Sequence, residues 1–376
     1  MTILDVATIP GDGIGPEVTA EAVKVVDTAA EKFGFAVKWT EFPFGAGYYL
    51  KHGRGLPESA FRDLADFKAL LLGAVGDPRV GPGPLEREIL LALRFHFDQY
   101  VNLRPALSFP GVPTPAPFPP GEALNAVIVR ENTEDLYMGL GGSGEGSFRI
   151  ELVADRGLYS LKGAVDLHFS PPVAAGFSIG LMSRPGIERI AGYAFALARR
   201  RGEKTVHAVS KANAVPHLYG FWDQCVRETA ARDYPDLELK FVNVDAVCYL
   251  MARRPPGWGV VLCPNLFGDI VSDLMSALAG GIGLAAAGNI GEGLSMFEPV
   301  HGSAPDIAGT GGANPLAAIL SAGMMLEHIG EKEASAAVEN AVRAYLASDG
   351  GKPIELGGDA VTARVGDAVR RALLRS

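Results

Sequence analysis

The N-terminal stretch joins a strand pattern, a glycine-rich turn and a helix pattern without a break, and no other feature limits the fold more. Residues 3–10, ILDVATIP, are apolar enough to predict a buried strand, and three glycines follow within GDGIG. Residues 15–34 predict a helix, because Pro16 suits a first turn, Glu17 favours the positive N-terminal end and Gly34 ends the pattern. A strand that passes directly into a helix indicates an α/β architecture.

The same alternation continues along the chain and supports this fold class. Further segments with strand or helix patterns lie at 36–42, 69–76, 187–204, 205–213, 259–281 and 314–330. The proline-rich residues 109–121 predict an exposed loop. A length of 376 residues allows about two domains.

Composition excludes several classes of function. The formal net charge is −9 and no run of lysine and arginine occurs, which argues against a nucleic-acid partner. No run of about 18 apolar residues and no basic segment followed by an apolar core is present, so neither a membrane span nor a signal peptide is expected. Cys225, Cys248 and Cys263 match neither a disulfide framework nor a zinc pattern. We expect a cytoplasmic protein without nucleic-acid or membrane partners.

The glycine-rich turn matches a phosphate-binding motif only in part. A dinucleotide fingerprint has the form G-x-G-x-x-G, with an acidic residue about 20 residues later. Here the spacing is G-x-G-x-G, and Pro16 follows at once. A purely structural turn and direct contact with a cofactor both remain open.

Two aspartates in the segment NLFGDIVSDL lie on one face of an expected helix. Asp269 and Asp273 are four residues apart and can together hold one hard cation through oxygen. A solvated helix face can show the same spacing, but the apolar neighbours favour a metal site. Mg²⁺ or Mn²⁺ is expected instead of zinc, because no histidine or cysteine completes a softer site. Asp245, in the apolar segment FVNVDAV, is a further acid that a metal would suit.

Three arginines lie in apolar sequence near the expected ends of elements: Arg94, Arg104 and Arg130. A buried guanidinium is costly unless it meets an anion, and its planar fork matches a carboxylate. One such arginine would usually be structural, whereas three favour a substrate with two or three carboxylates. Tyr137 and Lys211 are possible acid and base groups, although a role without chemistry stays open for both.

A loop of small residues, EPVHGSAPDIAGTGGANP at 298–315, is the last candidate. A loop of this length inside a compact domain is usually functional. Backbone amides and small side chains suit the close approach of a flat ligand such as adenine.

Together these segments resemble the β-decarboxylating dehydrogenase family, which includes isocitrate, isopropylmalate, homoisocitrate and tartrate dehydrogenases. The matching motifs occur in the family's order over nearly the whole chain, and they are GDGIGPEV, LALR, NLRPA, VRENTEDLY, SKANAV, NVDA, NLFGDIVSDL and EPVHGSAPDIAG. The resemblance implies two α/β domains with a mixed parallel and antiparallel sheet, not a Rossmann fold. Residues 1–98 with 257–376 would form a cofactor-binding domain. Residues 99–256 would form a smaller substrate and dimerisation domain with a hairpin arm near 140–175.

The resemblance also implies NAD-dependent oxidative decarboxylation of a 3-substituted (2R,3S)-malate to a 2-oxo acid, in a homodimer with shared active sites. The three arginines named above would grip the malate carboxylates. Asp269 and Asp273, with Asp245 of the partner subunit, would hold Mg²⁺ or Mn²⁺. Lys211 of the partner subunit would help remove the hydroxyl proton, and Tyr137 would protonate C3.

The loop motif implies that adenine is held by HGSAPDIAG, while the glycine turn only starts the fold. Asp306 can accept hydrogen bonds from both ribose hydroxyls of NAD and would repel the extra phosphate of NADP. Ile307 stands where NADP users of the family carry basic or phenolic groups. The residues expected at the cofactor are His301, Gly302, Ser303, Ala304, Asp306, Ile307, Asn314 and Asn213.

The C3 substituent of the substrate is the least determined point. Leu90 and Leu91 resemble the leucines that contact the isopropyl group in isopropylmalate enzymes, but Arg87 stands where those enzymes tend to carry a glutamate. An arginine there invites an anionic substituent, as in isocitrate, homoisocitrate or phosphonomethylmalate, unless it pairs with Glu86 or another acid at the surface. Two other functions stay open: a tartrate- or malate-type dehydrogenase, and a non-catalytic regulatory subunit like those of the isocitrate branch.

Overall fold

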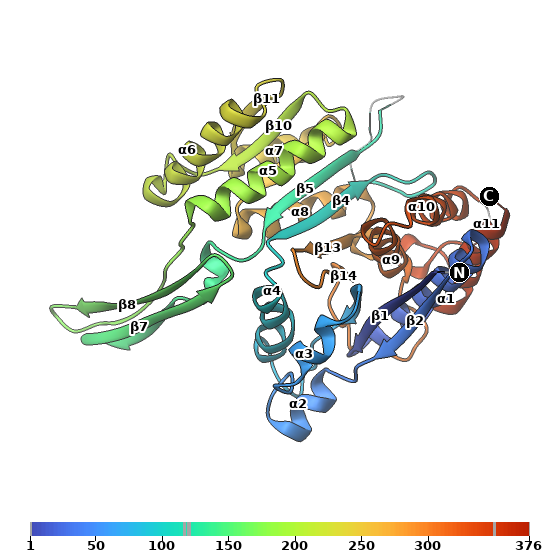
Figure 1. The fold of residues 1–376 in the computed structure, drawn as a ribbon, viewed down its shortest axis with the longest axis horizontal. Helices are drawn as coiled ribbons and strands as arrows, with labels where there is room; N and C mark the ends of the chain where they lie inside the picture. The colour runs from blue at the N-terminus through green and yellow to red at the C-terminus, as the bar shows by residue number, and fades with distance from the viewer. Residues whose placement is uncertain (1, 116–117, 119–121, 349–350, 376) are drawn as a thin grey trace.

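Ten strands form one continuous sheet in the part of the chain that the computed structural model describes, residues 2–115, 118, 122–348 and 351–375 (Figure 1). Spatial order differs from chain order, so segments distant in sequence meet in the middle of the sheet. From edge to edge the strands are β11 (Glu238–Asn243), β10 (Thr205–Ser210), β12 (Val260–Cys263), β5 (Asn125–Glu131), β4 (Val101–Leu107), β13 (Ala286–Ile290), β14 (Met296–Pro299), β3 (Ala69–Ala74), β1 (Thr2–Gly11) and β2 (Phe35–Glu41).

The sheet consists of two parallel blocks joined through an antiparallel centre. β2, β1, β3 and β14 run parallel to one another, and so do β5, β12, β10 and β11. β13 is antiparallel to both β14 and β4, and β4 is antiparallel to β5. The mixed sheet confirms the predicted α/β fold class and differs from the parallel sheet of a Rossmann fold.

Helices pack on both faces of this sheet (Figure 1). Those of the first third are α1 (Gly15–Phe33), α2 (Ala46–His52), α3 (Ala60–Ala65) and α4 (Ala92–His96). Those of the middle are α5 (Arg184–Arg201), α6 (Pro216–Asp233), α7 (Val244–Arg253) and α8 (Asn265–Ala279). Those of the last third are α9 (Leu316–His328), α10 (Lys332–Ala347) and α11 (Thr362–Arg375).

Apolar side chains gather into separate cores along the sheet. One core joins α1, α9, α10 and α11 to a face of β1 that carries Val6, while Ile9 on the opposite face packs toward α3 and α4. Another core joins α5, α6, α7 and α8 to β4, β5, β10 and β12, and it extends from Val101 to Ala279. Because β12 and α8 belong to this core, the packing favours a domain boundary after Ala279. The boundary at residue 256 that the sequence suggests stays a prediction.

A long hairpin projects from the body of the molecule (Figure 1). β7 (Ser147–Arg156) pairs with β8 (Tyr159–His168) over its full length, and the two strands run antiparallel to each other. β6 (Gly141–Glu145) and β9 (Ala174–Ser178) form a second antiparallel pair next to it. The four strands occupy the region in which the sequence predicts an arm.

The N-terminal strand, turn and helix are present as β1 and α1, and Gly34 ends α1 with a left-handed φ of 81°. Residues 109–115 and 118 of the proline-rich region form neither helix nor strand, whereas 116–117 and 119–121 lie outside the described residues. All three cysteines are free thiols. Across the described ranges, no helix combines the length and apolarity needed to cross a membrane.

Candidate active site

A cavity of about 310 Å³ lies beside the antiparallel centre of the sheet, and many residues singled out from the sequence line it. β4 supplies Arg104, the end of β5 supplies Arg130, α4 supplies Arg94 and α8 supplies Asp269. Strand order explains this convergence, because β4 and β5 are neighbours and α8 packs against both. One cavity therefore collects three guanidinium groups from segments that are distant in sequence.

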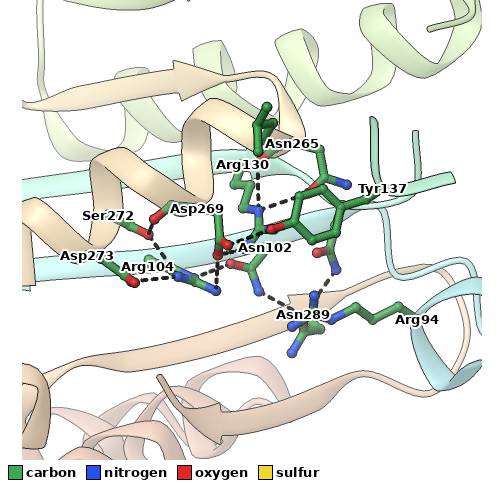
Figure 2. A network of polar contacts seen from close by, with 12 residues as sticks. Arg94, Asn102, Arg104, Arg130, Tyr137, Asn265, Asp269, Ser272, Asp273 and Asn289 are labelled. Atoms are coloured by element: carbon green, nitrogen blue, oxygen red, sulfur yellow. Dashed lines mark hydrogen bonds and ion pairs between the residues drawn. The ribbon is translucent and has the colours of Figure 1, made fainter. Parts of the chain in front are cut away.

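Asp269 is the centre of the polar network at this cavity (Figure 2). Its Oδ1 accepts a hydrogen bond from Arg130 Nη1 at 2.5 Å and lies 3.3 Å from Arg104 Nη2. Its Oδ2 accepts a hydrogen bond of 2.6 Å from the Tyr137 hydroxyl. Arg130 is 1% exposed, and its Nε donates to the backbone oxygen of Asn265 at 2.9 Å. The carboxylate thus balances a fully buried cation and fixes the position of the phenol.

Burial and the charges of this network together shift three pKa values. Burial acts to raise the pKa of Asp269, but Arg130, Arg104 and the hydrogen bond from Tyr137 outweigh it and hold that pKa below its ordinary value. Burial and the neighbouring Arg104 lower the pKa of Arg130 to about 10, so the guanidinium stays charged near neutral pH. Burial and the bond to Asp269 raise the pKa of Tyr137, so the phenol keeps its proton near neutral pH.

Asp269 and Asp273 both approach the guanidinium of Arg104. Arg104 Nη1 lies 3.4 Å from Asp273 Oδ1, and the Asp273 side chain is 57% exposed. The guanidinium of Arg104 thus contacts both carboxylates, and the carboxylate of Asp273 is open to solvent. Two carboxylates on the same helix face fit a hard divalent cation held through oxygen. No group of three or more His, Cys, Asp or Glu side chains suited to a metal occurs among the described residues, so Asp245 does not join this pair within one chain.

Buried amide side chains connect Arg104 with Arg94 across the sheet (Figure 2). Arg104 Nε donates to Asn102 Oδ1 at 2.6 Å, and Asn102 Nδ2 donates to Asn289 Oδ1 at 2.7 Å. Asn289 Nδ2 and Arg94 Nη2 both donate to Glu298 Oε1, at 2.8 and 2.9 Å. In the described part of the chain the buried Nε of Arg94 has no hydrogen-bond partner. This arginine therefore keeps a donor for an anionic ligand at the cavity.

The glycine-rich turn holds the loop that follows β14. The backbone N–H of Ile14 donates to Ser303 O at 2.8 Å, and that of Asp12 donates to Ala74 O at 2.7 Å. A Cβ on Gly13 would lie 1.9 Å from Ser303 O, and Gly13 has a φ of 58°. Only glycine fits this close approach in a left-handed conformation. The turn thus positions the loop, which is the structural role that the sequence left open.

Residues expected at the cofactor differ in their surroundings. His301 and Gly302 line the cavity. The buried Nε2 of His301 has no partner among the described residues, and burial lowers the pKa of its imidazole. A neutral ring with an unused nitrogen at the cavity fits a polar cofactor. Ser303 is buried, and Ala304 has a φ of 38°, which is uncommon for a residue with a side chain.

In the remainder of the loop, some residues are exposed and Asn314 forms hydrogen bonds within the chain. Asp306 and Ile307 are exposed, and Ile307 keeps 37% of its surface in contact with solvent. Asn314 is buried, where its Nδ2 donates to Glu355 Oε2 at 2.9 Å and its Oδ1 accepts from Leu316 N at 3.1 Å. Asp306 and Ile307 are thus accessible from solvent, whereas Asn314 supports the start of α9.

Lys211 and Asp245 meet each other and not the cavity. Lys211 Nζ lies 2.5 Å from Asp245 Oδ1, and the Asp245 side chain is 68% exposed. The ammonium group holds the pKa of Asp245 below its ordinary value. Asn213, two residues after Lys211, is exposed. One chain therefore brings together the arginines, Tyr137 and the α8 aspartates, but leaves the predicted base and third acid at a separate surface.

One wall of the cavity is a helical face that carries Glu86, Leu90, Leu91 and Arg94. A π-helical turn at Glu86–Leu91 passes directly into α4, which places these side chains on one side. Arg87 lies off this face, is exposed and does not line the cavity. Glu86, whose Oε2 accepts from Gly83 N at 2.9 Å, faces the cavity in its place.

Sequence reasoning missed several polar residues of the site, namely Glu86, Asn102, Asn265, Ser272, Asn289 and Glu298. Asn102 stands two residues before Arg104, so alternation along a strand could have placed both on one face. Ser272, whose hydroxyl accepts from Arg104 at 2.8 Å, lies one helical turn after Asp269. Glu298 is the first residue of the motif EPVHGSAPDIAG, and that motif was the signal for its place.

Comparisons with known proteins found a matching family model, similar sequences and a similar solved structure. The sequence model of the isocitrate/isopropylmalate dehydrogenase family matches residues 5–369. The 3-isopropylmalate dehydrogenase of Thermobifida fusca is 42% identical over 366 residues, which cover 96% of each chain. That of Mycobacterium tuberculosis is 41% identical over 373 residues, 98% of this chain and 100% of the relative. The crystal structure of isocitrate dehydrogenase from Methylococcus capsulatus matches with a TM-score of 0.82 at 36% identity and covers 98% of this chain and 99% of that one.

Proposed function

The chain belongs to the isocitrate/isopropylmalate dehydrogenase family, and from this premise we propose that it oxidises and decarboxylates a 3-alkylmalate of the 3-isopropylmalate type. The proposed cofactors are NAD and Mg²⁺ or Mn²⁺. The observation that carries the proposal is one cavity lined both by three arginines and by Leu90 and Leu91. The first group suits the carboxylates of a malate, and the second suits an apolar substituent.

The charge of the substituent can be argued from the wall of the cavity. Leu72, Val75, Leu90 and Leu91 line it together with Glu86, and Arg87 is exposed outside it. A carboxylate beside this wall would repel an anionic substituent, while an uncharged alkyl group gains from burial against the leucines. An isopropyl-like group therefore fits better than the anionic substituents of isocitrate, homoisocitrate or phosphonomethylmalate.

Asp269 and Asp273 are the proposed ligands of the metal within the chain. When bound, Mg²⁺ or Mn²⁺ would supply Lewis-acid polarisation of the substrate oxygen at C2. The lowered pKa of Asp269 keeps it ionised, and the exposed carboxylate of Asp273 is open to a ligand. Asp245 of the partner subunit would complete the set.

The residues of the chain fit the proton transfers of this reaction. Arg94, Arg104 and Arg130 bind the malate carboxylates and orient C2. When bound, NAD would supply the acceptor for the hydride of C2. Lys211 of the partner subunit would accept the hydroxyl proton as the C2 oxygen becomes a ketone. The bond from C3 to its carboxylate then breaks with release of CO₂, and Tyr137 donates its proton to C3. The products are the 2-oxo acid, CO₂ and NADH.

A homodimer is proposed because the predicted base and third acid lie away from the cavity of their own chain. Tyr249 and Leu250 on α7 and Ile270 on α8 are 60%, 45% and 51% exposed, and the two helices pack together. Neighbouring exposed apolar side chains mark an interaction surface. Two-fold pairing through this surface would bring Asp245 of one subunit toward the α8 aspartates of the other.

The proposed use of NAD rests on the exposed pair Asp306 and Ile307. Asp306 is exposed on the loop surface, and its carboxylate would accept hydrogen bonds from ribose hydroxyls. It would repel a 2′-phosphate, and Ile307 offers that phosphate no donor.

A kinetic panel tests the proposal. Purified protein with Mn²⁺ would be assayed for NADH and CO₂ with isopropylmalate, isocitrate, homoisocitrate, tartrate and phosphonomethylmalate. We expect the highest kcat/KM with isopropylmalate and the release of one CO₂ for each NADH formed. A preference for an anionic substituent would overturn the substrate assignment, and NADH without CO₂ would favour a tartrate- or malate-type reaction. No NADH from any substrate would favour the regulatory subunit.

A further inference from the structure

A second cavity, of about 670 Å³, lies against the face of the sheet opposite the active-site cavity. Strands β4, β5, β13 and β14 form its floor, α5 forms one wall, and α9 with α10 forms the other (Figure 1). We name this cavity, lined among others by Leu103, Leu197, Phe297, Met324 and Val338, the back groove. Its volume lies in the range of ligand sites, roughly 300–1,000 Å³. The proposed reaction uses none of it.

Alternate residues of the same strands line the back groove and the active-site cavity. On β4, Arg104 faces the active-site cavity and Leu103 faces the back groove. On β14, Glu298 faces the active-site cavity and Phe297 faces the back groove. Successive side chains of a strand point to opposite faces of a sheet. One layer of backbone therefore separates the cavities, and a ligand that displaces the floor of one also moves groups of the other.

Most strand residues on the floor of the back groove are apolar, and the walls add further apolar side chains. Leu103, Leu107 and Val127 on the strands face Leu197 on α5 and Met324 on α9. A surface of this kind gains about 25 cal/mol for each Å² of apolar area that a ligand removes from water. The apolar floor therefore favours a ligand with a hydrocarbon chain.

The rim of the back groove carries an excess of positive charge. Its basic residues are Arg200 and Arg201 at the end of α5, and Lys332 and Arg343 on α10; its acidic residues are Glu327 and Glu339. Glu339 already pairs with Arg343 at 2.8 Å. Arg200 and Lys332 have no ion pair with any residue that the structure describes, and both are exposed. They stand on opposite walls, on α5 and α10.

We propose that the back groove binds an amphipathic monocarboxylate, with its carboxylate at Arg200 and Lys332 and its hydrocarbon chain on the strand floor. Occupancy changes the binding of the malate substrate through the shared strands. A single negative charge suits a rim where two carboxylates oppose further anionic groups, which disfavours nucleotides and other polyanions. The substrate of the active-site cavity would itself suit this groove poorly, since a malate has little apolar surface to bury.

Direct binding of octanoate to the purified dimer, with no NAD or metal present, tests the site independently of catalysis. Isothermal titration calorimetry is expected to show saturable binding of one octanoate per chain. Propionate lacks the hydrocarbon chain and 1-octanol lacks the carboxylate, so each is expected to bind at least about tenfold more weakly. Equal binding of octanol and octanoate would overturn the role of the cationic rim.

Variants locate the site. Arg200→Glu combined with Lys332→Glu should weaken octanoate binding at least about tenfold. Ser335→Trp, on the α10 wall, should abolish it by filling the groove. Arg199→Glu is the matched control, because Arg199 is the neighbouring residue but pairs with Asp236 outside the groove. Unchanged melting temperatures would show that the variants fold. Octanoate binding that survives both groove variants would overturn the site.

The enzyme assay tests the coupling between the cavities. Saturating octanoate is expected to change the KM for the malate substrate at least about twofold in the unaltered enzyme, and not at all in Arg200→Glu/Lys332→Glu. Simple competition with the substrate that persists in the double variant would place octanoate at the three active-site arginines and overturn the proposal. Binding at the groove without any change in KM would overturn the coupling.

Discussion

The hydroxyl of Tyr137 donates a hydrogen bond of 2.6 Å to the same carboxylate, Asp269, that balances the buried Arg130. The proposed proton donor and a proposed metal ligand are therefore not independent. Any change in the charge of Asp269 alters both the orientation of the phenol and the stability of the guanidinium beneath it.

We expect Asp269→Asn to destabilise the metal-free protein by about 2 kcal/mol at pH 7, because Arg130 loses its charged partner. The pKa of Asp269 is lowered in the folded state, so its contribution is present above the ordinary value of 3.8 and is lost as pH falls through the lowered pKa. The stability difference from the unaltered chain should thus shrink below pH 3.8. Urea unfolding across pH measures it. Asp273→Asn is the control. It removes only the ion pair of 3.4 Å with Arg104, which is more exposed to solvent, so it should have little effect.

Tyr137→Phe and Lys211→Met should each lose most turnover, with a fall of roughly 10²–10⁴ in kcat and little change in KM. Mixing the two variants after reversible dissociation tests the shared site. Random pairing makes half of the dimers mixed, each with one intact site, so about a quarter of the unaltered activity should return. A mixture that stays inactive, although mixed dimers form, would contradict a base supplied by the partner subunit.

Gly13→Ala should displace the loop that carries His301 and Ser303, because the new Cβ would lie 1.9 Å from Ser303 O. The expected result is a raised KM for NAD and a lower melting temperature. Gly53→Ala is the matched control, since Gly53 also has a positive φ, 69°, but no atom within 4 Å of its Cβ position. The control should cost only about 1 kcal/mol of stability and leave the KM for NAD unchanged. Similar effects of both variants would mean that the turn does not fasten the loop.

Glu86→Gln should raise kcat/KM for homoisocitrate relative to isopropylmalate by about tenfold, because the carboxylate that faces the cavity no longer repels an anionic substituent. Arg87→Gln is its neighbouring control and should leave that ratio unchanged, since Arg87 is exposed outside the cavity. The reverse pattern would show that Arg87 reaches the substituent in the dimer.

Asp306→Lys with Ile307→Tyr should shift the ratio of kcat/KM for NADP over NAD upward by at least about tenfold, since a cation and a phenol then replace a repelling carboxylate. Steady-state kinetics with each cofactor measures the ratio. Both residues are exposed, so the melting temperature should change little. An unchanged cofactor preference would contradict the assignment of this pair to the ribose.

Local signals in the sequence were sufficient for the elements and for part of the site. Apolar runs and helix-ending residues predicted β1 and α1, and spacing along one helix placed Asp269 and Asp273 together. The convergence of Arg94, Arg104 and Arg130 could be inferred from the cost of burying three cations and from the family resemblance. It depends on strand order in the sheet, which no local pattern specifies.

Other features could not be predicted because they depend on register and tertiary contacts. A π-helical turn decides that Glu86, and not Arg87, lines the cavity, and one residue of helical register reverses the charge of that wall. The role of Gly13 depends on a contact with Ser303, almost 300 positions away. The back groove arises between α5 and α10, whose partnership has no sequence signature.

Only one layer of backbone separates the active-site cavity from the back groove, and this affects how substitutions can alter the enzyme. Leu103 and Phe297 stand immediately before Arg104 and Glu298 in the chain but face the other way. Their replacement can displace Arg104 or Glu298 while every group proposed to handle protons or carboxylates is retained. Evolution, or a laboratory library directed at these positions, can adjust turnover from a side of the protein that never meets the substrate.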